Sequence, residues 1–278
     1  MSNSKTMTDA RNDKRSSRRT VAISGLGLAV ALWAAGCAAP KPRTAVSAPG
    51  AKPLTLFLIG DSTMSDKPVI PAYPERGWGQ MLPMYFKTEV RIANHARNGR
   101  SSKSFRDEGR WSSVLALMKP GDYVIIQFGH NDEKKGDAAR FTEPFGEFKQ
   151  NLKRYVHEAR AAKAVPVLAT PVARRRFGAD AQVRDTHGDY PEAVRQVATE
   201  EQVPLLDLEK RSRELLSKMG PDQSKRLFDW VEPGEFEKCP EGLKDDTHFN
   251  AFGASRMCDL AVLEIRLAVP ELARRLVK

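Results

Sequence analysis

The chain has 278 residues and a formal charge of +10, with 45 Lys and Arg residues against 35 Asp and Glu residues. Six of the basic and two of the acidic residues lie in the first 37 positions, so the rest of the chain carries only +6. That remainder has no block of Lys and Arg with interleaved aromatic residues, and we therefore expect no nucleic-acid partner.

The first 37 residues have the pattern of an export signal. A basic segment, residues 1–19, precedes an uncharged apolar stretch, residues 20–36, that is too short to be a comfortable membrane span. The closing Ala34-Ala35-Gly36-Cys37 resembles a bacterial lipobox, in which the cysteine is lipidated and becomes the mature N-terminus. The sequence thus predicts a lipoprotein anchored through Cys37, facing the periplasm or the cell surface. Since Ala34 replaces the usual leucine, simple signal cleavage or an uncleaved anchor are alternatives.

The rest of the chain predicts a tether and one α/β domain. Residues 38–52, rich in Ala, Pro, Lys and Ser, are predicted to be a flexible tether, and residues 53–278 are long enough for one domain with a sizeable core. Helical segments separate five apolar strand segments, which indicates a parallel sheet covered on both faces, a three-layer α/β/α sandwich. The predicted strands are residues 54–60, 90–94, 122–128, 165–169 and 203–208, and the predicted helices are 81–86, 104–118, 145–162 and 192–201.

The first predicted strand delivers a serine to the edge of the sheet. Residues 54–60 are almost wholly apolar, which is typical of a strand buried on both faces. Gly60 lets the backbone turn sharply, so Ser62 is expected at the carboxyl edge, where open α/β sheets bind ligands. In the alternative interpretation, Asp61 or Ser62 only caps the next helix.

Two further predicted strands are followed by groups that can donate hydrogen bonds. Residues 94–101 follow the second strand and contain Gly99, whose backbone N–H is not shielded by a side chain. Residues 129–132 follow the third strand and contain Asn131, whose side-chain amide is a donor at the same edge. Taken singly, each stretch also fits an ordinary turn.

A stretch near the C-terminus, residues 245–250, supplies a candidate base. Serine is a weak nucleophile until a base takes its proton, and that base needs a third group to fix its tautomer. Asp245, three residues before His248, can be that group on one loop, with Asn250 as the predicted cap of a C-terminal helix. Alternatively, His248 is an exposed residue at the helix entry. A metal site is not expected, because no other His or Cys lies at ligand spacing.

These motifs resemble the four blocks of the SGNH (GDSL-type) hydrolases in their order and approximate spacing. The blocks are Gly60-Asp61-Ser62, Gly99, Gly129-His130-Asn131-Asp132 and Asp245-x-x-His248, and the resemblance covers nearly all of residues 53–278. Within that superfamily the chain resembles the rhamnogalacturonan acetylesterase branch, carbohydrate esterase family 12. The stretches that carry this second resemblance are Gly77-Trp78-Gly79-Gln80, Asn98-Gly99-Arg100-Ser101, residues 170–177 and Thr186-His187-Gly188-Asp189-Tyr190.

The resemblance implies a role for each matching residue. Ser62 would be the nucleophile, His248 the general base and then acid, and Asp245 the carboxylate that orients His248. Asp246 is the adjacent alternative to Asp245, and His187 is the rival base.

An oxyanion hole is implied in the same way. It would comprise the backbone N–H groups of Ser62 and Gly99 and the side-chain amide of Asn131. Each fixed donor at a developing oxyanion is worth a factor of roughly a hundred to a thousand in rate. No cofactor is expected.

The function implied by the resemblance is removal of O-acetyl groups from a polysaccharide, with rhamnogalacturonan or pectin as the first expectation. An SGNH lipase or thioesterase, and a non-catalytic carbohydrate-binding envelope lipoprotein, are the alternatives. A polar sugar ester needs aromatic and basic residues around the pocket, and arginines can bind carboxylates in bidentate pairs, although a solvated charged loop explains them equally well. The candidates are Trp78, Arg174, Arg175, Arg176, His187 and Tyr190.

Two cysteines remain after Cys37, and they flank the candidate base. An exported chain can oxidise Cys239 and Cys258 to a disulfide, which would join the loop of residues 245–248 to the helix after it. Two buried free thiols are the alternative.

Overall fold

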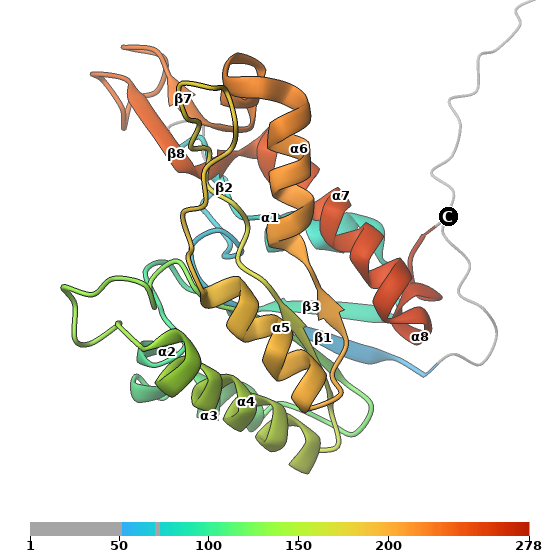
Figure 1. The fold of residues 1–278 in the computed structure, drawn as a ribbon. Helices are drawn as coiled ribbons and strands as arrows, with labels where there is room; N and C mark the ends of the chain where they lie inside the picture. Colours follow the sequence, from blue (N-terminus) through green and yellow to red (C-terminus); the bar gives the residue numbers. More distant parts are fainter. Residues whose placement is uncertain (1–51, 70–72, 278) are drawn as a thin grey trace, which may run out of the picture. The chain divides into compact units, whose positions relative to one another are not determined.

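The computed structural model describes residues 52–69 and 73–277 (Figure 1). The predicted export signal with its Cys37, and nearly all of the predicted tether, therefore lie outside the described residues. Within the described ranges, the apolar stretches of the helices are too short to cross a membrane.

A five-stranded sheet forms the centre of the domain, and all of its neighbouring strands are parallel. From one edge to the other, the strands are β3 (Val90–Asn94), β1 (Leu54–Gly60), β4 (Tyr123–Gln127), β5 (Val165–Ala169) and β6 (Leu205–Leu206). The predicted sheet is confirmed, and its strand order is that of flavodoxin-like folds. Only β6 is much shorter than the segment predicted for it.

Both faces of the sheet are covered, because the side chains of each strand alternate between two apolar clusters. On β1, Leu56 and Leu58 join one cluster, whereas Phe57 and Ile59 join the other. The first cluster includes residues of α1 (Trp78–Met81), α6 (Leu208–Gln223), α7 (Ala251–Ala268) and α8 (Pro270–Ala273). The second includes residues of α2 (Ser104–Asp107), α3 (Arg110–Leu115), α4 (Lys149–Ala161) and α5 (Tyr190–Glu200). Figure 1 shows these two groups of helices on opposite sides of the strands, which confirms the three layers.

Glycines interrupt two of the predicted helices. The predicted helix 104–118 is divided into α2 and α3 because Gly109 has a φ of 69°, a left-handed conformation that favours glycine. The segment Pro144–Phe148 is an irregular turn around Gly146, so α4 begins at Lys149. Two short 3-10 turns, Leu82–Tyr85 and Ser224–Leu227, precede β3 and β7.

A second, antiparallel sheet was not predicted. It consists of β2 (Glu75–Arg76), β8 (Leu243–Asn250) and β7 (Phe228–Val231), with β8 in the middle, and Figure 1 shows the three strands grouped together. Residues 245–250 therefore belong to a strand and not to the predicted loop. Their polar side chains give no apolar alternation, so the strand depends on pairing with β2 and β7. Asn250 does cap α7, accepting a hydrogen bond from the Gly253 N–H at 2.9 Å.

Candidate active site

The structure brings together the three residues that the sequence predicts as a catalytic triad. Ser62 follows β1 directly, and its Oγ lies 2.8 Å from Nε2 of His248, although 186 positions separate the two residues. Nδ1 of His248 lies 2.7 Å from Oδ2 of Asp245. With the Nδ1 proton donated to Asp245, the Nε2 lone pair can accept the Ser62 hydroxyl proton.

A bulge in β8 provides the local geometry of this pair. Phe228 of β7 is opposite Phe249, whereas Trp230 is opposite Lys244, so one residue of β7 faces the four residues 245–248 of β8. The extra residues let the chain fold back on Asp245, whose Oδ1 accepts the N–H groups of Thr247 and His248 at 2.6 and 2.9 Å. The carboxylate is thus fixed by its own strand.

The surroundings shift the pKa values of Asp245 and His248 in opposite directions. Burial alone would raise the pKa of Asp245, but the hydrogen bond and charge of His248 and the two backbone N–H groups lower the pKa to about 2. Burial would lower the pKa of His248, yet the hydrogen bond to Asp245 and the charges of Glu75 and Asp245 raise the pKa above its usual value. Asp245 therefore stays ionised and increases the basicity of His248.

The alternative carboxylate, Asp246, is held elsewhere. Its Oδ1 accepts hydrogen bonds from Arg175 Nη1 at 2.7 Å and from Trp230 Nε1 at 2.9 Å, and its Oδ2 lies 3.3 Å from Arg176 Nη1. These contacts occupy Asp246, and they also explain two of the arginines that the sequence placed around the substrate.

The predicted oxyanion donors lie on the two loops next to the turn of Ser62. The sheet places β1 between β3 and β4, so the residues after these strands meet at one edge. The Arg97 N–H donates to Gly60 O at 2.9 Å, and Gly99, with a φ of 75°, completes the turn after β3. Asn131, after β4, donates its amide to Arg100 O at 3.1 Å, so both predicted donors are fixed on adjoining loops.

A buried contact also links the Ser62 turn to the Asn131 turn. Oδ2 of Asp61 lies 3.2 Å from Nδ1 of His130, and both side chains are buried. Burial lowers the pKa of His130 to about 4, so its ring is neutral at neutral pH and packs against Asp61 without a full positive charge.

One predicted substrate contact is wrong, because Trp78 is 0% exposed. Its indole N–H donates to Gln127 Oε1 at 2.8 Å, and its ring fills the core between α1 and the sheet. The large apolar area of a tryptophan is what the core requires here, and a side chain without exposed surface cannot touch a sugar.

The polar groups of the other predicted substrate contacts are engaged within the protein. The single hydroxyl proton of Tyr190 is shared between two acceptors, Asp132 O at 2.9 Å and Thr142 O at 2.6 Å. Arg174 forms an ion pair with Glu133 at 2.5 Å. A substrate role for these residues stays a prediction.

The rival base, His187, has partners at both ring nitrogens. Nδ1 lies 2.9 Å from Glu133 Oε2, and Nε2 lies 2.9 Å from Val172 O. The Ser62 hydroxyl has His248 as its imidazole partner, so the geometry favours His248 as the base.

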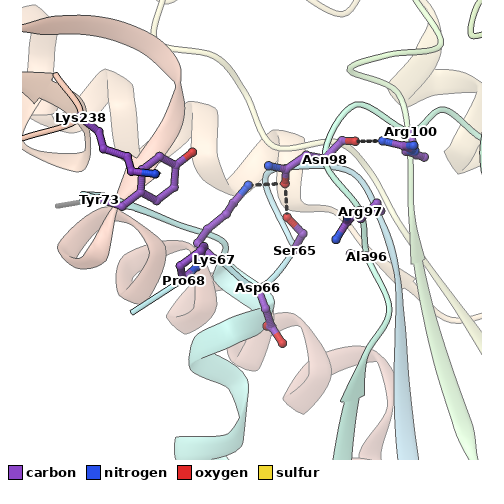
Figure 2. A pocket seen from close by; sticks show the side chains of 10 residues that line it. All are labelled: Ser65, Asp66, Lys67, Pro68, Tyr73, Ala96, Arg97, Asn98, Arg100 and Lys238. Carbon is purple, nitrogen blue, oxygen red and sulfur yellow. Dashed lines mark hydrogen bonds between the residues drawn. The ribbon is translucent and has the colours of Figure 1, made fainter. Parts of the chain in front are cut away.

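A pocket of about 370 Å³ opens beside the serine turn (Figure 2). Oγ of Ser65 donates to Oδ1 of Asn98 at 2.5 Å, and Nζ of Lys67 donates to the same atom at 2.5 Å. Arg97 and Lys238, both exposed, also line the pocket. Sequence reasoning missed Lys67 and Lys238, because nothing in the chain order indicates that they approach this edge.

The remaining predicted sites concern cysteines and metals. The structure records Cys239 and Cys258 as free thiols, with Cys258 buried in the core, so the disulfide that the sequence left open is not formed in it. No group of three or more His, Cys, Asp or Glu side chains in the described part of the chain is arranged to hold a metal ion.

Comparison with known proteins places this site in a family. The profile of the GDSL-like Lipase/Acylhydrolase family matches residues 58–256. Rhamnogalacturonan acetylesterase RhgT of Bacillus subtilis is 42% identical over 209 residues, covering 75% of this chain and 88% of its own length. The probable rhamnogalacturonan acetylesterase YesY of the same organism is 36% identical over 211 residues, covering 76% and 92%.

A solved structure agrees with these matches. The crystal structure of YxiM from Bacillus subtilis superimposes with a TM-score of 0.66 at 28% identity, covering 78% of this chain and 57% of that one. The family profile spans most of the chain and includes Ser62 and His248. The chain therefore belongs to the GDSL-like lipase/acylhydrolase family, groups there with the rhamnogalacturonan acetylesterases, and is a serine esterase.

Proposed function

We propose that the protein is a carbohydrate esterase that removes O-acetyl groups from a rhamnogalacturonan or pectin type of polysaccharide. The observation that carries the proposal is the continuous hydrogen-bonded series from Ser62 through His248 to Asp245, at 2.8 and 2.7 Å. The names of the two Bacillus subtilis relatives support acetyl groups on this class of polysaccharide as the substrate.

Acylation would begin with proton transfer from Ser62 Oγ to Nε2 of His248. The freed oxygen attacks the acetyl carbonyl carbon, and the carbonyl oxygen takes up negative charge. The N–H groups of Ser62 and Gly99 and the amide of Asn131 stabilise that charge. His248 then gives its proton to the sugar oxygen, which leaves as an alcohol.

Deacylation would repeat these steps with water. His248 takes a proton from a water molecule while the oxygen of that water attacks the acetyl-serine. His248 then gives the proton to Ser62 Oγ as acetate leaves. Asp245 stays ionised throughout, because its pKa of about 2 is far below neutral, and it stabilises the imidazolium in both steps.

The residues that line the pocket beside the serine turn favour an acidic polysaccharide as the substrate. Two exposed cations, Arg97 and Lys238, line it, and a guanidinium can bind a carboxylate through two parallel hydrogen bonds. This pocket replaces Arg175 and Arg176 as the source of positive charge, because Asp246 holds those two residues.

Acetate release from a panel of substrates tests the proposal. We expect faster release from acetylated pectin or rhamnogalacturonan than from acetylated xylan or a small aryl acetate. Ser62→Ala should reduce kcat by a factor of roughly 10⁴ or more, whereas the matched variant Ser113→Ala, at an exposed serine of α3, should leave it unchanged. Equal rates on all four substrates would contradict the acidic-polymer assignment, and full activity of Ser62→Ala would overturn the mechanism.

A further inference from the structure

Three buried ionisable side chains lie around the bulge of residues 245–248 and take no direct part in the bond-making and bond-breaking steps of the proposed mechanism. Lys67, Glu75 and Asp229 are only 4%, 9% and 2% exposed. They come from the loop after β1, from β2 and from β7, and β2 and β7 are the two strands that flank β8. Charged groups are rarely buried without partners, so each needs a physical account.

Lys67 and Glu75 compensate each other. Nζ of Lys67 lies 2.5 Å from Oε1 of Glu75 and donates to Oδ1 of Asn98, while the Tyr73 hydroxyl donates to Oε2 of Glu75 at 2.5 Å. The two side chains are thus in direct contact in a buried place, where the attraction between them offsets part of the cost of removing each from water.

Asp229 has no equivalent partner. Its Oδ1 is buried and accepts no hydrogen bond from any residue that the structure describes. Asp229 also lies between Phe228 and Trp230, at the point where β7 faces the bulge of residues 245–248. A buried carboxyl oxygen without a donor disfavours the ionised form of its group.

The charged groups around Asp229 come from β2, from β8 and from the loop after β1. Burial first, and then the charges of Glu75 and Asp245, raise the pKa of Asp229 to about 7, while the charges of His248 and Lys67 act in the opposite direction. The Tyr73 hydroxyl is also close enough to be affected by Asp229. Asp229 therefore changes its charge in the pH range in which an imidazole also titrates.

We propose that Asp229 is a positioning residue that sets the proton affinity of His248, and with it the pH at which the base is available to Ser62. An ionised Asp229 stabilises the imidazolium that forms when His248 takes the serine proton, and a protonated Asp229 does not. The two groups then titrate as a coupled pair, with pKa values that belong to the pair. The proposal deepens the proposed function, since it rests on His248 being the base.

The direct test is an NMR titration of the His248 ring in a Ser62→Ala background, which needs no substrate. Adding Asp229→Asn removes the charge with little change in volume, and we expect the pKa of His248 to fall by roughly half to one pH unit. The matched control is Asp222→Asn, at an exposed carboxylate paired with Lys225, which should leave the titration of His248 unchanged. An unchanged His248 pKa in the Asp229→Asn chain would overturn the proposal.

A second measurement keeps the proposal testable if the Asp229→Asn chain fails to fold. In the Ser62→Ala chain alone, the His248 resonances should show two inflections, because two coupled groups release their protons in two steps. A single inflection contradicts the coupling.

Kinetics then connect the titration to activity. In Asp229→Asn with an intact Ser62, the acid limb of kcat/KM on an aryl acetate should move to lower pH by the same amount as the His248 pKa. An acid limb that stays in place while the NMR pKa moves would overturn the catalytic part of the proposal. A chain that shows the NMR shift but releases no acetate from polysaccharides would contradict the proposed function and not the coupling.

Discussion

Two adjacent carboxylates, Asp245 and Asp246, have different partners in the active site. Asp245 contacts His248 and the N–H groups of its own bulge, whereas Asp246 binds Arg175 and Trp230. The side chains point to different neighbours because the chain folds back on Asp245 within the bulge, whereas Asp246 points toward Arg175 and Trp230. At the scale of single residues, the direction of each side chain separates the carboxylate that contacts His248 from the carboxylate that contacts Arg175 and Trp230.

Amide substitutions should separate these roles. We expect Asp245→Asn to reduce kcat by a factor of roughly 10³ to 10⁴. A neutral amide favours the wrong tautomer of His248, and it does not stabilise the imidazolium that forms when His248 takes a proton. Asp246→Asn should stay within about tenfold of the unsubstituted enzyme in kcat and lose stability instead, since it leaves Arg175 without its buried anion. Initial rates of acetate release and urea unfolding measure the two effects. A larger loss of kcat in Asp246→Asn than in Asp245→Asn would reverse the assignment.

The small antiparallel sheet is the element that brings His248 to Ser62. Its middle strand, β8, contains His248 and runs directly into α7, which packs on the main sheet through Met257, Ala261 and Ile265. The join is tight, because a Cβ on Gly253 would lie 1.7 Å from the backbone oxygen of Leu227. The start of α7 and the end of the 3-10 turn before β7 are therefore in direct backbone contact.

Gly253→Ala tests the importance of this contact. Alanine is the better helix former by about 1 kcal/mol, but here its methyl group would collide with a backbone that cannot move freely. We expect a net loss of at least about 2 kcal/mol of unfolding free energy, which lowers Tm by roughly 4–8 °C.

The matched control for that experiment is Gly136→Ala. Gly136 is exposed, and a methyl group added there would meet none of the described residues within 4 Å apart from its own chain neighbours, so a change within about 0.5 kcal/mol is expected. Thermal unfolding followed by circular dichroism compares the two chains. Equal Tm values would show that the contact with Leu227 relaxes at no cost.

At the scale of the whole molecule, one parallel sheet serves as a platform for loops from distant parts of the chain. The turns after β1, β3 and β4 meet at its carboxyl edge, and β8 adds His248 from a separate sheet. Both faces of the platform are closed by apolar clusters, so the catalytic groups rest on a core with little freedom to move.

The whole molecule also includes the N-terminal segment, whose function stays a proposal. We propose that Cys37 anchors the esterase to a bacterial membrane through a lipid, because residues 1–37 combine a basic segment, an apolar stretch and a lipobox-like end. Cys37→Ser should move the protein from the membrane fraction to the soluble fraction and leave acetate release unchanged. Unaltered fractionation of Cys37→Ser would remove the lipoprotein assignment.

Local patterns were sufficient for the main sheet and for the motif order. Apolar runs such as residues 54–60 and 123–127 are recognisable as buried strands, because short runs of this composition are typical of a parallel sheet covered on both faces. The shared order of Ser62, Gly99, Asn131 and His248 likewise identified the family. Trp78 shows the limit, since an aromatic side chain was expected to contact the sugar, whereas the burial of Trp78 depends on packing between α1 and the sheet.

The sequence by itself therefore determined the strand and helix layers, the family and the residue types that a serine esterase needs. Only the tertiary structure decided which carboxylate meets His248, that the Asp245–His248 segment is a bulge between β2 and β7, and that Lys67, Glu75 and Asp229 surround it. The physical reason is range. The pattern of an apolar run can be read from residues that are neighbours along the chain. The pairing of polar strands and the placement of charges depend on contacts between residues far apart in sequence.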